Sequence, residues 1–192
     1  MRAARVIVLL AAVAAVAALV YIYRSPSATG EAPAAPPAAA RPAEGAAING
    51  MVVPVAGVAR TELTDSWGQS REGGARAHQA IDIMAAGGTP VIAAFGGRVE
   101  KLFVSARGGT TAYIRSDDGR WIAYYAHLAR YADGLREGQR LRRGDRVGYV
   151  GDTGNSGIGN YHLHFALARM APGEKWYQGI PVDPYPLLRG HP

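Results

Sequence analysis

Four of the five histidines in this chain fall in three short motifs, and one of these motifs also contains an aspartate. The motifs read HQAID at residues 78–82, YAHL at residues 125–128 and HLHF at residues 162–165. The chain has no cysteine, so any metal ion must be held by His, Asp or Glu side chains. Two imidazoles and one carboxylate from distant parts of a chain suit a catalytic Zn²⁺ with its fourth position open to water.

The spacing within these motifs favours β-strands. On a strand, His162 and His164 point to the same face, and the apolar residues between and after them pack on the other face. On a helix the same pair would lie on nearly opposite faces, where sharing a metal ion is difficult. His78 and Asp82 also share a face if their segment is a strand, although a helix permits that spacing too. A strand therefore accounts for both motifs.

A zinc ion held in this way supports amide hydrolysis. It lowers the pKa of its bound water to about 7 and polarises a carbonyl group. Further histidines beside it can act as general base or stabilise the developing oxyanion. Two His and one carboxylate also describe the facial triad of non-haem Fe(II) oxygenases, so an iron site is an alternative. The two further histidines disfavour iron, and metal analysis of the purified protein separates the two cases.

The elements that position these side chains are predicted to be strands of an all-β domain. From residue 48 onward, short apolar stretches alternate with Gly pairs and turn signals about every ten residues, and no long segment has helical periodicity. The sequence DDG at residues 117–119 lies between two alternating stretches and predicts a hairpin turn. The expected strands are residues 90–95, 97–104, 111–115, 121–127, 146–150 and 162–168.

The N-terminus predicts export and membrane attachment. Residues 6–23 are apolar and follow Arg2 and Arg5, so we expect a membrane anchor within residues 1–24, with a cleaved signal peptide as the alternative. Residues 25–47 are rich in Pro, Ala and Gly and predict a flexible linker before a folded domain at 48–192. We therefore expect the domain in the cell envelope, on the periplasmic side of the inner membrane. The net charge of +6 is modest, and export makes nucleic acid an unexpected partner.

The three motifs, in this order, resemble those of the LytM/lysostaphin-type zinc endopeptidases, peptidase family M23. The match extends over residues 54–188 and includes several supporting phrases. They are GTPV at residues 88–91, GRV at 97–99, VGYVG at 147–151 and the tail at 176–188. The sequence departs from the usual family pattern at Ala80, at residues 160–161 and at Ala166, which affects the expected groove shape and substrate preference more than the reaction.

The resemblance implies a fold and a role for each motif residue. The implied fold is an antiparallel β-sheet groove of the LytM (duplicated hybrid motif) type. His78, Asp82 and His164 would bind Zn²⁺, and His127 and His162 would flank a metal-activated water as catalytic residues. The implied substrate is the peptide part of bacterial peptidoglycan, either stem cross-links or interpeptide bridges.

Two further expectations accompany this assignment. Arg71 lies just ahead of the first ligand and is expected to line the substrate cleft, although a plain loop role is equally compatible with the sequence. The alternative function is a non-catalytic peptidoglycan-binding module or an activator of another cell-wall hydrolase. The complete set of five polar residues counts against that alternative, because such degenerate family members have typically lost metal ligands.

Overall fold

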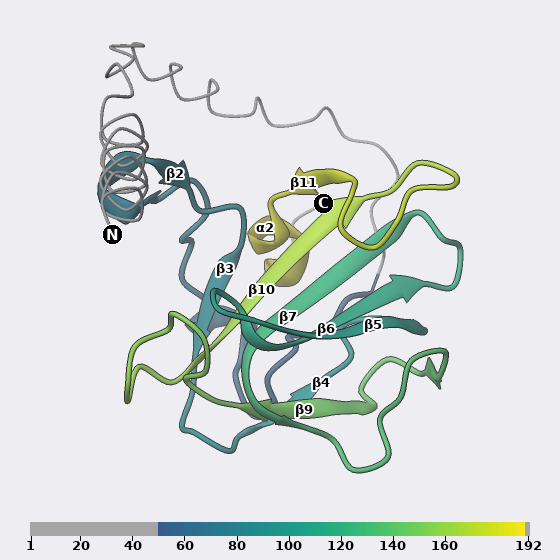
Figure 1. Cartoon of the computed structure of the whole chain (residues 1–192), viewed down its shortest axis with the longest axis horizontal. Helices are drawn as coiled ribbons and strands as arrows, with labels where there is room; N and C mark the ends of the chain where they lie inside the picture. The colour runs from purple at the N-terminus through teal and green to yellow at the C-terminus, as the bar shows by residue number, and fades with distance from the viewer. Residues whose placement is uncertain (1–49, 191–192) are drawn as a thin grey trace, which may run out of the picture. The chain divides into compact units, whose positions relative to one another are not determined.

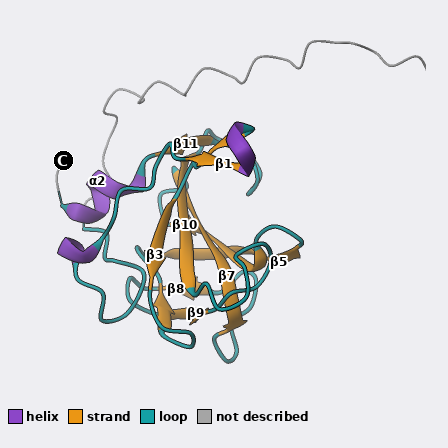
Figure 2. Ribbon diagram, turned by 90° about the vertical axis from the view of Figure 1, so that its left-hand side faces the viewer, coloured by secondary structure: helices purple, strands orange, loops and turns teal. Residues whose placement is uncertain are grey.

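A computed structural model describes residues 50–190, which form an antiparallel β domain (Figures 1 and 2). The predicted anchor at residues 1–24 and the predicted linker at 25–47 lie outside the described residues. In the described part, no helix has the length and apolar character needed to cross a bilayer. The predicted all-β, antiparallel class is confirmed.

Nine strands of the described region form one sheet in which every pairing is antiparallel. Its main path runs in the order β11 (Ile180–Val182), β10 (His162–Arg169), β7 (Trp121–Tyr131), β6 (Gly109–Ser116), β5 (Gly97–Ser105) and β8 (Arg140–Leu141). β3 (Ile81–Met84) pairs with the first half of β10, and β9 (Arg146–Val150) joins the end of β7 to β4 (Pro90–Ile92). The central position of β10 and β7 is visible in Figure 1.

Short elements complete the domain. β1 (Ser70–Arg71) and β2 (Arg76–Ala77) form a separate two-stranded hairpin around the 3-10 turn η2 (Glu72–Gly74). A second 3-10 turn, η1, covers Arg60–Glu62, and the helix α2 covers Pro184–Arg189. Asp183 caps α2 by accepting a hydrogen bond from the Tyr185 N–H at 2.9 Å, and Gly190 ends the helix in the left-handed conformation.

The core explains why the sheet presents its polar residues on one face. On β10, Leu163, Phe165 and Leu167 are almost fully buried, in alternation with His162 and His164. Phe165 packs edge-on against Tyr125 of β7, with ring centroids 5.3 Å apart. Each such buried side chain contributes about 1.5–3 kcal/mol relative to an exposed one. This burial decides which face of β10 is turned inward, and the two histidines are consequently left on the opposite face.

The predicted strands are present, although several bounds differ: β7 continues to Tyr131 rather than ending at residue 127. The hairpin turn at residues 117–119 closes with a hydrogen bond from the Gly119 N–H to the Ser116 carbonyl at 2.9 Å. β4 ends at Ile92 rather than residue 95. The expectation that His78 and Asp82 share one strand is wrong, because His78 precedes β3. Instead, the His78 backbone bonds outside the main sheet: its N–H donates to the Gln69 carbonyl (2.9 Å), and its carbonyl accepts from the Gly68 N–H (2.7 Å).

Candidate functional site

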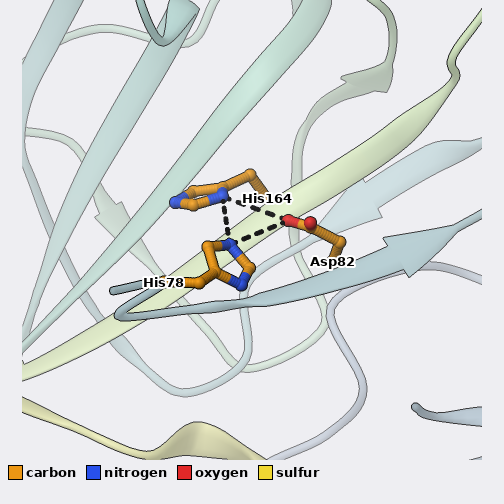
Figure 3. A group of neighbouring side chains, drawn as sticks. All are labelled: His78, Asp82 and His164. Carbon is orange, nitrogen blue, oxygen red and sulfur yellow. Dashed lines mark hydrogen bonds and ion pairs between the residues drawn. The ribbon is translucent and has the colours of Figure 1, made fainter. Parts of the chain in front are cut away.

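Three of the predicted residues bring one potential ligand atom each to a single point (Figure 3). The register of β3 and β10 pairs Asp82 with His164, and the Asp82 Oδ1 atom lies 3.1 Å from the His164 Nδ1 atom. His78 approaches from the segment before β3. Its Nε2 atom lies 3.0 Å from His164 Nδ1 and 3.2 Å from Asp82 Oδ1. The antiparallel pairing therefore unites residues that are 82 positions apart in the chain.

The donor set fits a zinc ion. Zinc in proteins is held tetrahedrally at about 2.0–2.2 Å by His nitrogen and carboxylate oxygen, which places neighbouring donor atoms roughly 3.3–3.6 Å apart. The separations of 3.0–3.2 Å between these three atoms are close to that spacing. Two nitrogens and one oxygen also leave one tetrahedral position for water or substrate.

Backbone carbonyls orient three of the four histidines. In each case the Nδ1–H group donates to a carbonyl oxygen, which leaves the Nε2 lone pair available for a metal ion or a proton. The partners are the carbonyls of Ser66 (2.8 Å from His78), Thr153 (2.7 Å from His127) and Asn160 (2.9 Å from His162). His164 differs, since it turns its Nδ1 atom toward Asp82 and His78.

Asp82 is held on both sides. Arg71 donates a hydrogen bond from Nη2 to the Asp82 Oδ2 atom at 2.6 Å, so only Oδ1 faces the two histidines. The Asp82 N–H donates to the Ser66 Oγ atom at 3.0 Å. Burial acts to raise the pKa of Asp82, but interactions with the adjacent His164 and His78 side chains outweigh burial and hold that pKa well below its usual value. Asp82 is therefore ionised, with one oxygen directed at the two histidines.

The two remaining histidines lie beside this group. The rings of His127 and His162 are 4.9 Å apart between centroids, and His127 lies 5.7 Å from the ring of His164. The His162 Nε2 atom is 3.8 Å from Asp82 Oδ1. Burial lowers the pKa of His127 to about 4 and also lowers the pKa of His164. His127 is consequently neutral near pH 7 and able to accept a proton.

His127 reaches the site through an irregularity of β7. Its backbone has φ of 60°, the only positive value among the non-glycine residues described. Between Tyr125 and Leu128 the register advances three residues on β7 but two on β6, so β7 contains a bulge here. Regular alternation would have placed His127 on the core face with Tyr125. The bulge instead lets His127 line the cleft, while Tyr125 and Leu128 stay in the core.

All six predicted site residues line one open cleft of about 290 Å³. They are Arg71, His78, Asp82, His127, His162 and His164. The glycine-rich segments at residues 108–109 and 154–159 are turns beside this cleft. Gly154 lies so close to Gly109 and to the Arg107 carbonyl that a side chain at position 154 would collide with that backbone. These glycines therefore shape the wall of the cleft.

Sequence reasoning missed several residues of the site. A row of aromatic rings continues from His164 to Tyr124 (5.9 Å between centroids), then to Tyr113 (4.6 Å) and Trp176 (4.6 Å). The last three rings of this row line a second hollow of about 240 Å³, which shares Tyr124 with the cleft. The alternation of β7 could have revealed Tyr124, because it occupies the face opposite to the core residue Tyr125. No sequence signal marks Ser66, which contacts His78 through its backbone carbonyl and Asp82 through its side-chain oxygen.

Comparison with known proteins gives a consistent result. The model of peptidase family M23 matches residues 76–184. The L-Ala--D-Glu endopeptidase of Bacillus subtilis is 35% identical over 130 residues, covering 65% of this chain and 38% of that protein. The peptidoglycan DD-endopeptidase ShyC of Vibrio cholerae is 36% identical over 90 residues, covering 47% of this chain and 20% of that protein. This chain therefore spans less than two-fifths of the length of either relative.

Solved structures agree with the sequence comparisons. The catalytic domain of the antimicrobial peptidase lysostaphin from Staphylococcus simulans superposes with a TM-score of 0.55 at 26% identity. The match covers 68% of this chain and 95% of that catalytic domain. The likeness thus extends over nearly the whole of a compact peptidase domain.

Proposed function

Because the chain belongs to peptidase family M23, we propose that it is a zinc-dependent endopeptidase that hydrolyses peptide bonds in bacterial peptidoglycan. The observation that carries this proposal is the convergence of His78 Nε2, Asp82 Oδ1 and His164 Nδ1 within 3.0–3.2 Å of one another, beside two further histidines in an open cleft. The names of the Bacillus and Vibrio relatives, both endopeptidases, support the substrate class.

His78, Asp82 and His164 would hold the zinc ion. Bound there, zinc supplies an activated water and polarises the carbonyl of the scissile peptide. Arg71 occupies the second oxygen of Asp82 at 2.6 Å, so the carboxylate would present a single oxygen to the metal. Partners of this kind orient ligands and tune metal affinity.

His127 and His162 would handle protons. Each has its Nδ1–H group on a backbone carbonyl, and each is buried beside the ligand group. The Nε2 atoms are consequently available to take a proton as the peptide carbonyl is attacked, to return it to the leaving amine, or to donate a hydrogen bond to the developing oxyanion. Because both histidines lie beside the proposed metal ligands, they could act on the same substrate together.

The proposal extends to location. We infer that residues 1–24 attach the enzyme to the inner membrane and that residues 25–47 let the peptidase domain reach peptidoglycan on the periplasmic side. The apolar run at residues 6–23 and the Pro/Ala-rich composition after it support this. Fractionation of cells producing the full chain, compared with a chain lacking residues 1–24, tests it. Recovery of the full chain in the cytoplasm would refute it.

The activity is tested by digesting defined muropeptides with the purified full chain and identifying the products by mass. We expect endopeptidase products that disappear on chelation and return with added zinc. His164→Ala should lose both bound zinc and hydrolysis, and its circular dichroism spectrum would establish that it is folded. Hydrolysis retained by a zinc-free His164→Ala protein would refute the assignment. Binding to peptidoglycan without any product from the zinc-loaded wild type would instead support a non-catalytic binding module.

A further inference from the structure

The second hollow, which we call the aromatic hollow, contains no charged residue among the described residues that line it. Its walls come from four neighbouring strands, β6, β7, β10 and β11 (Figure 1), and from the loop at residues 171–179. Its aromatic rings and side-chain amides belong to Tyr113, Tyr124, Trp176, Tyr177, Gln79 and Gln178. The cleft, in contrast, contains the charged pair Arg71 and Asp82. The two hollows therefore differ in the chemistry that they can bind.

The register of the sheet creates the aromatic hollow. Tyr113 of β6 and Tyr124 of β7 are register partners, and their rings lie 4.6 Å apart between centroids. On β10, Ala166 is the register partner of Tyr124, and Ala168 follows it on the same face. These two methyl side chains leave room beside the rings that larger side chains would fill.

The loop between β10 and β11 positions Trp176 at the hollow. The Trp176 ring lies 4.6 Å from the ring of Tyr113 and 5.1 Å from that of Tyr177, measured between centroids. Arg115 of β6 donates a hydrogen bond to the Glu174 carbonyl at 2.9 Å, which attaches the loop to the sheet two residues before Trp176. The rings are therefore already arranged as a binding surface, which lowers the cost of ordering them on a ligand.

Such a surface suits an uncharged sugar ring. A pyranose presents C–H groups on its faces and hydroxyl or amide groups at its edge. The faces pack on aromatic rings, whose π-faces carry partial negative charge, and the edge groups hydrogen-bond to amides and hydroxyls. Gln79 and Gln178 supply amides, and burial raises the pKa of Tyr113 and of Tyr124, so their hydroxyls stay protonated. A charged peptide side chain would meet no opposite charge among the described residues of this lining.

The aromatic hollow lies within reach of a substrate bound in the cleft. Tyr124 lines both, and its ring is 5.9 Å from that of His164. The steps from His164 through Tyr124 and Tyr113 to Trp176 place the last ring at most about 15 Å from the first, roughly the span of four to five extended residues. A sugar joined to the peptide within that distance of the scissile bond can occupy the hollow while the bond lies at the proposed metal site.

On the basis of the proposed function, we infer that the aromatic hollow is a subsite for an uncharged N-acetylhexosamine ring of the glycan strand, and that Trp176 is its main contact. The enzyme therefore selects stem peptides that are still attached to the glycan and cuts them close to the attachment point. Free peptides of the same sequence, which lack the ring, are poorer substrates.

The test compares a disaccharide-bearing muropeptide with the sugar-free peptide of the same sequence. Because packing of a ring face and neutral hydrogen bonds both contribute to binding, we expect the wild-type kcat/KM to be about 10-fold higher for the sugar-bearing substrate, mainly through a lower KM. In Trp176→Ala, the ratio of the two kcat/KM values should fall to within about twofold of one. Ala168→Leu keeps every ring but fills part of the hollow, and it should lower the ratio in the same way.

Tyr149→Ala is the matched control. It removes an aromatic side chain from β9, outside the aromatic hollow, and should keep the full ratio. Equal kcat/KM for the two substrates in the wild type would overturn the inference while the proposed function stands. A ratio that persists in folded Trp176→Ala and Ala168→Leu proteins would also overturn it, because the hollow would then hold part of the peptide or nothing.

Binding supplies a readout that is independent of hydrolysis. A tetramer of N-acetylglucosamine contains no peptide, and its calorimetric titration into the full chain should show binding that Trp176→Ala weakens about 10-fold or more and Tyr149→Ala leaves unchanged. If neither muropeptide substrate is cleaved, the proposed function fails, and this titration still decides the inference. No binding by the wild type, or equal binding by Trp176→Ala, contradicts it.

Discussion

Two neighbouring strands deliver histidines to the same cleft by different means. β10 is regular, so His162 and His164 reach the cleft through ordinary alternation while Leu163 and Phe165 fill the core. β7 contains a bulge, and His127 reaches the cleft only because its backbone takes a left-handed conformation with φ of 60°. Regular alternation suffices for the two histidines of β10, but a residue that must approach them from the adjacent strand needs a local break in the ladder.

The bulge is supported by close backbone contacts. The His127 N–H donates to the Gly108 carbonyl at 2.8 Å, and the His127 Nδ1–H donates to the Thr153 carbonyl at 2.7 Å. Gly151 lies directly against the chain after the bulge, where a side chain would collide with Ala129. Such a conformation costs about 1–3 kcal/mol and persists only where surrounding contacts maintain it. The backbone conformation of His127 therefore depends on contacts with the surrounding segments.

The largest effect is expected on the regular strand. His164→Ala removes one of the three proposed ligands, so zinc binding should be lost and hydrolysis should fall by roughly 10³-fold or more, since the proposed chemistry depends on the metal. Zinc content by mass spectrometry and muropeptide turnover measure the two effects together. A variant that keeps stoichiometric zinc would show that β10 does not supply a ligand.

The bulged strand should give a different pattern. His127→Asn keeps a side-chain donor for Thr153, and Asn tolerates positive φ, but it removes the ring that would exchange a proton. We expect activity to fall about 10²- to 10⁴-fold with zinc binding unchanged. Parallel measurement of zinc content and kcat distinguishes it from His164→Ala. If His127→Asn lost as much zinc as His164→Ala, the proposal that β10 supplies a zinc ligand and β7 a proton-transfer residue would be wrong.

A smaller effect is expected where Arg71 supports Asp82. Arg71→Gln removes the charged partner of Oδ2, and loss of such an outer contact typically weakens metal affinity by about 10- to 100-fold. Competition with a fluorescent zinc chelator measures the change. Exposed Arg142→Gln is the matched control and should bind zinc as the wild type does. Unchanged zinc affinity in Arg71→Gln, with altered KM instead, would indicate that Arg71 acts on substrate.

A substitution outside β7 should also disturb the bulge. Gly151→Ala places a methyl group against the Ala129 backbone and should destabilise the protein by about 1–3 kcal/mol, the usual range for overpacking. Gly96→Ala is the control, because a methyl group there meets only atoms at 3.3 Å or beyond. Denaturant unfolding compares the two. Equal stability of both variants would mean that the contact at Gly151 does not restrain the bulge.

The smallest effect concerns the pH dependence of stability in zinc-free protein. Burial lowers the pKa of His127 to about 4 from 6.5 and also lowers the pKa of His164, so the unfolded chain binds more protons than the folded one between these values. Stability should therefore be greatest above pH 6.5 and decline as the pH falls toward 4. Thermal unfolding between pH 4 and 7 measures this decline. His127→Asn should make it shallower, and an identical pH dependence in wild type and variant would contradict the burial of a neutral His127.

Local residue patterns are enough to predict the strand class, the hairpin turn at residues 117–119 and the shared face of His162 and His164. These features follow from local rules, because turn chemistry and a two-residue alternation act between near neighbours. The motif order also identified the family that the comparisons confirm. Expectations for residues 1–47 remain predictions.

The assembly of the site, in contrast, depends on long-range contacts. The register of β3 against β10 places Asp82 opposite His164, the 66–69 segment holds His78 outside the strand, and the bulge turns His127 into the cleft. The same holds for the contact of Arg71 with Asp82 and for the carbonyls that orient the histidines. Each depends on backbone atoms or side chains that are distant in sequence or carry no residue signature, so no local pattern encodes them.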